Sequence, residues 1–141
     1  MQNIDWSPLI KELYYVGQVF VALLLGGLVG IQREKIGKAA GIRTYALVTG
    51  GSALFTLLAV LSFPTDAARI IAQIIVGIGF LGAGAILHKD DKISGLTTAA
   101  GLWMMAAVGI AVGLEKYFIA FTVSFLVVLV LMFNEEKFTK K

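Results

Sequence analysis

The sequence contains no cysteine, two prolines and one histidine, and only 15% of its 141 residues are charged. The absence of cysteine excludes disulfides, thiolate metal sites, iron–sulfur clusters and cysteine nucleophiles. Apolar residues, by contrast, make up 58% of the chain, and the mean hydropathy is +0.87. A soluble protein of this size buries only about two-thirds of its surface. We therefore expect much of this apolar surface to face lipid.

Five apolar segments are long enough to cross a membrane as helices, since a spanning helix needs about 20 mostly apolar residues. They cover residues 13–31, 45–63, 70–88, 96–113 and 117–133. Thr65 or Asp66 is a suitable N-cap for the third segment, and Ser94 for the fourth. We predict an all-α polytopic membrane protein, a bundle of five transmembrane helices. Residues 1–141 are expected to form one transmembrane domain without a separate soluble domain.

Basic residues are distributed unevenly between the loops. One side of the predicted membrane carries nine of them: Arg33, Lys35, Lys38, Arg43, Lys89, Lys92, Lys137, Lys140 and Lys141. The other side carries three: Lys11, Arg69 and Lys116. Because cytoplasmic loops collect Lys and Arg, the N-terminus is predicted to lie outside the cell and the C-terminus in the cytoplasm.

Residues 77–84 read "GIGFLGAG", which contains the G-x-G-x-x-G spacing of a dinucleotide-binding loop. A true fingerprint lies between a strand and a helix and has an acid about 20 residues further on. Here that position falls near Leu102, inside another apolar segment, and the glycines lie in the middle of a predicted span. We therefore expect no nucleotide cofactor at this motif.

Small residues instead favour close packing of membrane helices, because they let two backbones approach each other. The predicted packing residues are Gly26, Gly30, Gly77, Gly79, Gly82, Gly84, Gly109 and Gly113. The third segment has glycine on several faces, so we expect it at the centre of the bundle. A local break in that helix, lining a polar cavity, is the alternative.

Polar side chains within or beside the apolar segments are the candidate functional residues: Arg33, Glu34, Arg43, Thr44, Asp66, Arg69, Gln73, Thr97 and Thr98. Arg33, Glu34 and Arg43 are predicted either to form an ion-pair cluster or to act as interfacial anchors. A buried amide at Gln73 would need a hydrogen bond across helices. No arrangement of residues indicates catalysis, a metal site, a cofactor or nucleic-acid binding.

Two stretches of the sequence carry a resemblance to a known family. "GGLVGIQREKIGKAAGIRTYALVTGGSALF" resembles the opening signature of the MgtC/SapB membrane proteins. "RIIAQIIVGIGFLGAGAILHKDDKISGLTTAAGLWMMAAVGIAVG" resembles the second, longer signature. Together they cover most of residues 26–113, in the same order and spacing. Many members continue into a soluble cytoplasmic domain, whereas this sequence ends at Lys141.

The resemblance implies a bacterial inner-membrane protein with about five spans, acting in adaptation to low magnesium and, in some pathogens, in survival inside host cells. It implies a regulatory role through binding of other membrane proteins, the F-type ATP synthase among them. Further positions that match the signatures are Gly41, Gly95, Ala99 and Trp103. The resemblance assigns no catalytic residue, and Gln32 stands where an acid is common in the family.

Two functional hypotheses follow. The first is a non-enzymatic protein of the lipid bilayer that acts through helix–helix contacts as a homo-oligomer, expected to be a dimer. A partner would dock on the Gly26/Gly30 or the Gly109/Gly113 face. The second is a transporter or channel for Mg²⁺ or another small solute, working as an oligomer, with the polar candidates lining its path.

Overall fold

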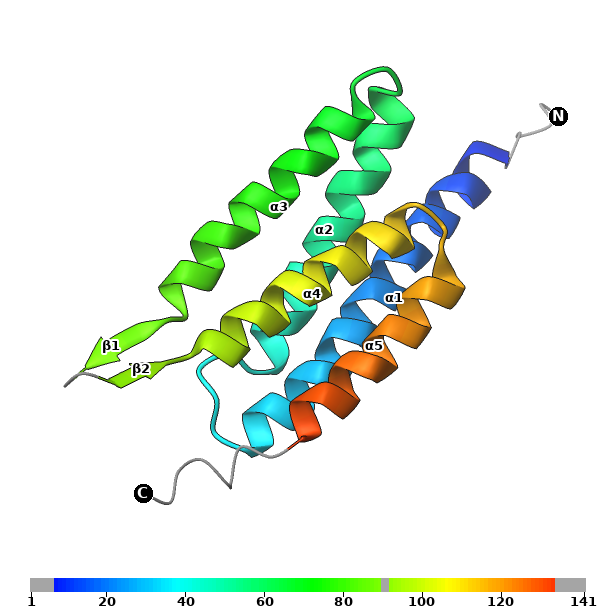
Figure 1. Cartoon of the computed structure of the whole chain (residues 1–141). Coiled ribbons are helices and arrows are strands. Elements are labelled where there is room, and N and C mark those ends of the chain that lie inside the picture. Colours follow the sequence, from blue (N-terminus) through cyan, green and yellow to red (C-terminus); the bar gives the residue numbers. More distant parts are fainter. Residues whose placement is uncertain (1–6, 90–91, 134–141) are drawn as a thin grey trace, which may run out of the picture.

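A computed structural model describes residues 7–89 and 92–133, which form five helices and one short hairpin (Figure 1). The elements are α1 (Ser7–Lys35), α2 (Ile42–Ser62), α3 (Ala67–Gly84), β1 (Leu87–Lys89), β2 (Lys92–Ser94), α4 (Leu96–Gly113) and α5 (Tyr117–Met132). The predicted helical fold class is confirmed. Four helices are long and apolar enough to cross a membrane, and α5, with 16 residues, is a shorter apolar helix.

Consecutive helices run in opposite directions along the bundle (Figure 1). The α1–α2 loop, the hairpin and the end of α5 therefore lie at one end, which we call the basic end. Arg33, Lys35, Lys38 and Arg43 belong to the segments at this end. Lys137, Lys140 and Lys141 lie outside the described residues. The side of the membrane that each end faces stays a prediction.

Helices α2 and α4 form the centre of the bundle, with half of each span buried, whereas only 17% of the α3 span is buried. The expectation that the glycine-rich third helix occupies the centre is therefore wrong. Helix α3 lies at the periphery (Figure 1), and only its Ile78 and Gly82 are buried. Glycine brings no apolar side chain to bury, so a run of glycines does not by itself attract neighbouring helices.

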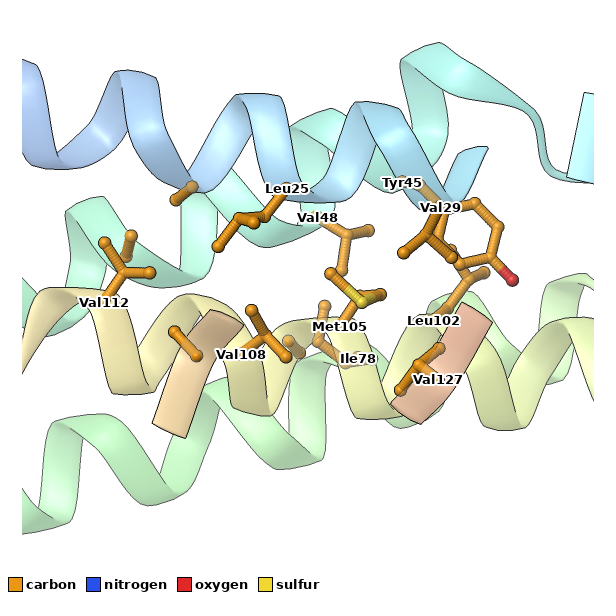
Figure 2. Close-up of a cluster of buried hydrophobic side chains, with 14 of the residues drawn as sticks. Leu25, Val29, Tyr45, Val48, Ile78, Leu102, Met105, Val108, Val112 and Val127 are labelled. Carbon is orange, nitrogen blue, oxygen red and sulfur yellow. The ribbon is translucent and has the colours of Figure 1, made fainter. Parts of the chain in front are cut away.

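The core lies where α1, α2 and α4 meet (Figure 2); α3 adds one buried residue to it and α5 adds three. Met105 and Val108 of α4 point towards Leu25 of α1 and Val48 of α2. Tyr45 and Leu102 close the core towards the basic end. The centre of the bundle is therefore mainly apolar and lies at the contact of these three helices.

Several helix boundaries differ from the predicted spans. Helix α1 extends beyond 13–31 at both ends, because its polar flanking residues continue the backbone hydrogen bonding. Helix α3 ends at Gly84, and Leu87 pairs with Ser94 in the β1–β2 hairpin, so the end of the predicted 70–88 span is a strand. Gly95, not Ser94, caps α4. Gly95 has φ = 89°, and a Cβ there would overlap the carbonyl oxygen of Ala85.

Candidate functional site

The glycines of α1 bring its backbone into direct contact with α2. A methyl carbon placed on Gly26 would overlap the carbonyl oxygen of Tyr45 and lie 2.5 Å from Oγ1 of Thr49. A methyl carbon on Gly30 would lie 2.6 Å from Cα of Ile42. The space beside the G-x-x-x-G pair of α1 is therefore occupied by α2 of the same chain.

The glycines of α4 make the same kind of contact with α2, and Thr49 is contacted from both α1 and α4. A Cβ on Gly109 would overlap the carbonyl oxygen of Thr49, and one on Gly113 would lie 2.7 Å from the carbonyl oxygen of Ala53. Both predicted docking faces, Gly26/Gly30 and Gly109/Gly113, are thus occupied within the chain. The expectation that a partner docks there is wrong, because the neighbouring helix already uses the space.

The glycines of α3 differ from these. A Cβ on Gly82 would lie 3.6 Å from Cβ of Ala99 on α4, which is ordinary van der Waals contact. A Cβ on Gly77, Gly79 or Gly84 would meet no atom of another helix within 4 Å. Within one chain these three glycines bring no helices together.

A buried polar group lies at the basic end, and we call Arg33, Tyr45 and Thr98 the Arg33 site. The Arg33 side chain is fully buried, and its Nη2 donates to Oγ1 of Thr98 at 3.4 Å. The Tyr45 hydroxyl, also fully buried, donates to the carbonyl oxygen of Thr98 at 3.4 Å. Helices α1, α2 and α4 each supply one residue. Gly101 makes room for the tyrosine, because a Cβ there would overlap the Tyr45 hydroxyl.

Glu34, predicted to join Arg33 and Arg43, has a different role. Its Oε2 accepts a hydrogen bond from the backbone N–H of Ile42 at 2.9 Å, at the first residue of α2. A carboxylate at a helix N-terminus is stabilised by the exposed N–H groups and the helix dipole. Arg43 and Thr44 are exposed, whereas Arg33 points into the bundle. The predicted three-residue cluster is therefore divided between the core and the surface.

The remaining predicted residues do not join the Arg33 site. Asp66 and Arg69 form an exposed ion pair of 3.2 Å at the opposite end of the bundle. Gln73 and Thr97 are exposed as well. Among the described residues, Arg33 and Thr98 are the two candidates from different helices that a hydrogen bond joins, whereas Asp66 and Arg69 pair with each other at the start of α3.

Hydrogen bonds between α1 and the α4–α5 region form a further polar feature that the sequence reasoning missed. Near the α4–α5 turn, Nε2 of Gln18 donates to Oε1 of Glu115 at 3.0 Å, and the hydroxyls of Tyr14 and Tyr117 are 3.1 Å apart. At the basic end, Nε2 of Gln32 donates to the carbonyl oxygen of Leu131 at 3.1 Å. The signal was the spacing of Gln18 and Gln32. Fourteen residues are about four helical turns, so both amides lie on one face of α1.

Two apolar hollows follow α3 on the side of α2. One, of about 540 Å³, is lined mainly by apolar residues of α2 and α3, with Gly51, Gln73 and Gly77 among its walls. The other, of about 430 Å³, lies towards the basic end, beside Thr44, Phe80 and Gly84. Neither hollow offers a group of charged side chains, so neither resembles a site for an ionic substrate.

The fold and these contacts define a class of protein. Large apolar side chains point outward, Phe80 being 82% and Phe118 84% exposed, while Arg33, glycines and hydroxyl groups lie inside. Water would be a poor solvent for that surface, whereas lipid covers it without a penalty. The chain has the construction of a helical membrane protein.

Comparison with known proteins agrees with this class. The profile of the MgtC family matches residues 19–139, and the chain belongs to this family. It is 44% identical over 103 residues to Protein MgtC of Salmonella typhimurium strain LT2, an alignment that covers 73% of this chain and 45% of that protein. It is 37% identical over 126 residues to the putative magnesium transporter YhiD of Escherichia coli K12, covering 83% and 59%.

A third relative, an uncharacterized protein of Haemophilus influenzae, is 40% identical over 113 residues, covering 72% of this chain and 48% of that protein. The chain thus spans about half the length of the curated relatives it matches. No solved structure matches it.

Proposed function

We propose that this chain is a non-enzymatic protein of the bacterial inner membrane that acts in adaptation to low magnesium. It works as a homo-oligomer, a dimer, through contacts with other membrane proteins. Its N-terminus lies outside and its C-terminus in the cytoplasm, because the basic end collects the arginines and lysines that stay on the cytoplasmic side. Membership of the MgtC family and the name of the YhiD relative support the link to magnesium.

The observation that carries this proposal is the composition of the bundle interior. Its centre is filled mainly by apolar side chains and glycines, the buried hydroxyls of Thr49 and Thr56 donate to carbonyl oxygens of their own helix, and the two large hollows are apolar. Among the described residues, the charged side chain that is buried inside the bundle is Arg33, and its guanidinium repels a divalent cation. Gln73 and Thr97 face outward instead of marking a path through the bundle. These features favour a surface that binds protein helices over a channel for Mg²⁺.

The F-type ATP synthase is the partner class that the family resemblance implies, and we include it in the proposal. Its test is affinity purification of the tagged chain from bacterial membranes grown in limiting magnesium. A subunit of the synthase should co-purify with the chain and be lost when an outward side chain of α5, Phe118→Ser, is changed. If no subunit of the synthase co-purifies with the chain under these conditions, the synthase is not its partner.

Transport of Mg²⁺ is the second candidate function, and the printed name of YhiD is the observation that favours it. Proteoliposomes containing the chain and a magnesium-sensitive dye decide between the two functions. We expect influx equal to that of empty vesicles while the same chain restores growth of a deletion strain in low magnesium. Influx above the empty vesicles that falls in Arg43→Ala would establish transport and overturn the first proposal.

A further inference from the structure

Helix α3 leaves most of its surface uncovered by its own chain. Only 17% of its span is buried, against 50% for α2 and α4. Phe80, in its second half, is 82% exposed, and the positions of Gly77 and Gly84 face open space. In the membrane, the uncovered surface of α3 is therefore open to contact with another molecule.

One face of α3 has the residue spacing of a helix–helix seam. The face consists of Ile70, Gln73, Gly77, Phe80 and Gly84, and we call it the α3 seam. Successive members are three, four, three and four residues apart, which is the repeat of two helices packed along a shallow crossing. The seam alternates small and large residues, so a neighbouring backbone could approach at the glycines and a ring could fill the space between them.

The α3 seam borders the two apolar hollows between α3 and α2, which together we call the furrow. The 540 Å³ hollow includes Gln73 and Gly77 in its α3 wall, and the 430 Å³ hollow includes Phe80 and Gly84. Leu81 lines both hollows, so the furrow follows α3 from one half of the bundle to the other. A helix laid along the seam would therefore also enter the space between α3 and α2.

Gln73 indicates the chemistry of the occupant. Its side chain is exposed and makes no hydrogen bond with any other residue that the structure describes. It lies six residues after Ala67, so it is about 9 Å below the start of α3. Lipid tails offer no hydrogen-bonding partner at that depth, and an unpaired amide in hydrocarbon is unfavourable by several kcal/mol. The occupant must therefore bring a donor and an acceptor to this level.

We propose that the α3 seam is the interface between two copies of this chain, with the two α3 helices packed side by side. The inference rests on the homo-oligomer of the proposed function and assigns its interface. Two copies inserted in the same orientation are related by a two-fold axis along the membrane normal, so identical residues meet at the same depth. Each Gln73 amide then donates to and accepts from its counterpart.

The rest of the seam fits the same arrangement. The two Phe80 rings meet in one layer, and the glycine layers at Gly77 and Gly84 above and below supply the space that the rings require. The alternative small-residue faces of the chain, on α1 and α4, are already filled by α2. The opposite flank of α3, with Gly79, has no polar side chain that needs a partner.

Single cysteines test the interface directly, because the natural sequence has none. Gly77→Cys and Gly79→Cys are matched variants: both positions face open space, so both tolerate a side chain, and two residues place them about 200° apart around the helix. A disulfide requires Cα atoms within about 7 Å. Under mild oxidation in membranes, we expect a disulfide-linked dimer for Gly77→Cys and a monomer for Gly79→Cys.

Equal or stronger crosslinking of Gly79→Cys overturns the proposal, since it places the contact on the other flank. If neither variant crosslinks while native mass spectrometry of the unmodified chain shows a dimer, the α3 interface is wrong but the homo-oligomer stands. A monomer by native mass spectrometry in mild detergent, together with no crosslinking in membranes, rejects both.

The amide pair is tested separately by Gln73→Leu, which keeps the size of the side chain and removes its hydrogen bonds. Measured by energy transfer between labelled copies in vesicles, dimerisation should weaken by about tenfold, as expected for losing a pair of hydrogen bonds within a membrane. Ala72→Leu, one residue away on the exposed opposite flank, is the control and should leave dimerisation unchanged. Equal affinities for the unmodified chain and Gln73→Leu would contradict the role of the amide.

Discussion

The same substitution, glycine to alanine, should have opposite effects on stability at two adjacent positions of α1, Gly26 and Gly27. A methyl group on Gly26 would overlap the backbone carbonyl oxygen of Tyr45 and lie 2.8 Å from its carbonyl carbon. Backbone atoms of α2 can move away only if the whole helix moves. On Gly27 the methyl group would meet only Cγ2 of Ile42, at 3.9 Å, which is ordinary contact. Gly26→Ala should therefore separate α1 from α2, and Gly27→Ala should not.

The expected magnitudes follow from two effects. Replacing a helical glycine by alanine stabilises the helix by about 0.5–1 kcal/mol, and this gain applies to both variants. Overpacking a tight interface costs about 1–3 kcal/mol, and this loss applies to Gly26 alone. We expect Gly27→Ala to be slightly more stable than the natural chain. Gly26→Ala should lie about 1–3 kcal/mol below Gly27→Ala in its free energy of unfolding.

The measurement is reversible unfolding in mixed micelles, in which SDS is titrated into mild detergent and helix content is followed by circular dichroism. Both variants carry one added methyl group on neighbouring residues, so their effects on the unfolded chain are closely matched. If Gly26→Ala unfolds at the same SDS fraction as Gly27→Ala, the backbones of α1 and α2 do not approach as closely as described, and the reasoning about the glycine contacts is refuted.

Three further substitutions test other parts of the bundle with the same titration. Glu34→Ala removes the carboxylate that accepts the Ile42 N–H and should lower the free energy of unfolding by about 1 kcal/mol; Glu34→Gln, which keeps an acceptor, should lose less. Arg33→Met keeps most of the side-chain volume in the bundle, so it should retain more stability than Arg33→Ala, which leaves a cavity beside Thr98 and should unfold at a lower SDS fraction. Gly95→Ala forces a side chain into a left-handed conformation of φ = 89° and should cost at least about 1 kcal/mol, with wild-type stability as the contrary result.

The helices could be predicted from the sequence because hydrocarbon leaves the backbone few choices. A chain that crosses lipid must satisfy every N–H and C=O internally, so an apolar run of sufficient length becomes a helix whatever its neighbours. The β1–β2 hairpin lies outside that rule, since its short strands are held by a few local hydrogen bonds and by the conformation of Gly95. A high glycine content likewise does not indicate whether a helix lies at the centre of the bundle or at its periphery.

The candidate site was harder to predict, because it depends on how each helix is rotated. Arg33 and Thr98 are separated by 65 positions, and nothing local indicates that both point to the same place. Tyr45 was missed because a tyrosine at the start of an apolar segment usually lies at the membrane interface. Its burial depends on Gly101, which lies on another helix. Glu34, in contrast, is eight positions from Ile42 and acts through the start of the next helix.

The length of α1 has a consequence for how the molecule sits in a bilayer. Its 29 residues measure roughly 43 Å along the axis, against about 30 Å of hydrocarbon. Lys11 and Glu12 occupy its second turn, and ionised groups resist immersion, so a steep tilt cannot hide the surplus. The first turns of α1 therefore project into the headgroup layer and the aqueous phase. At that level the exposed Leu9, Ile10 and Leu13 would meet the boundary between headgroups and hydrocarbon instead of the bilayer interior.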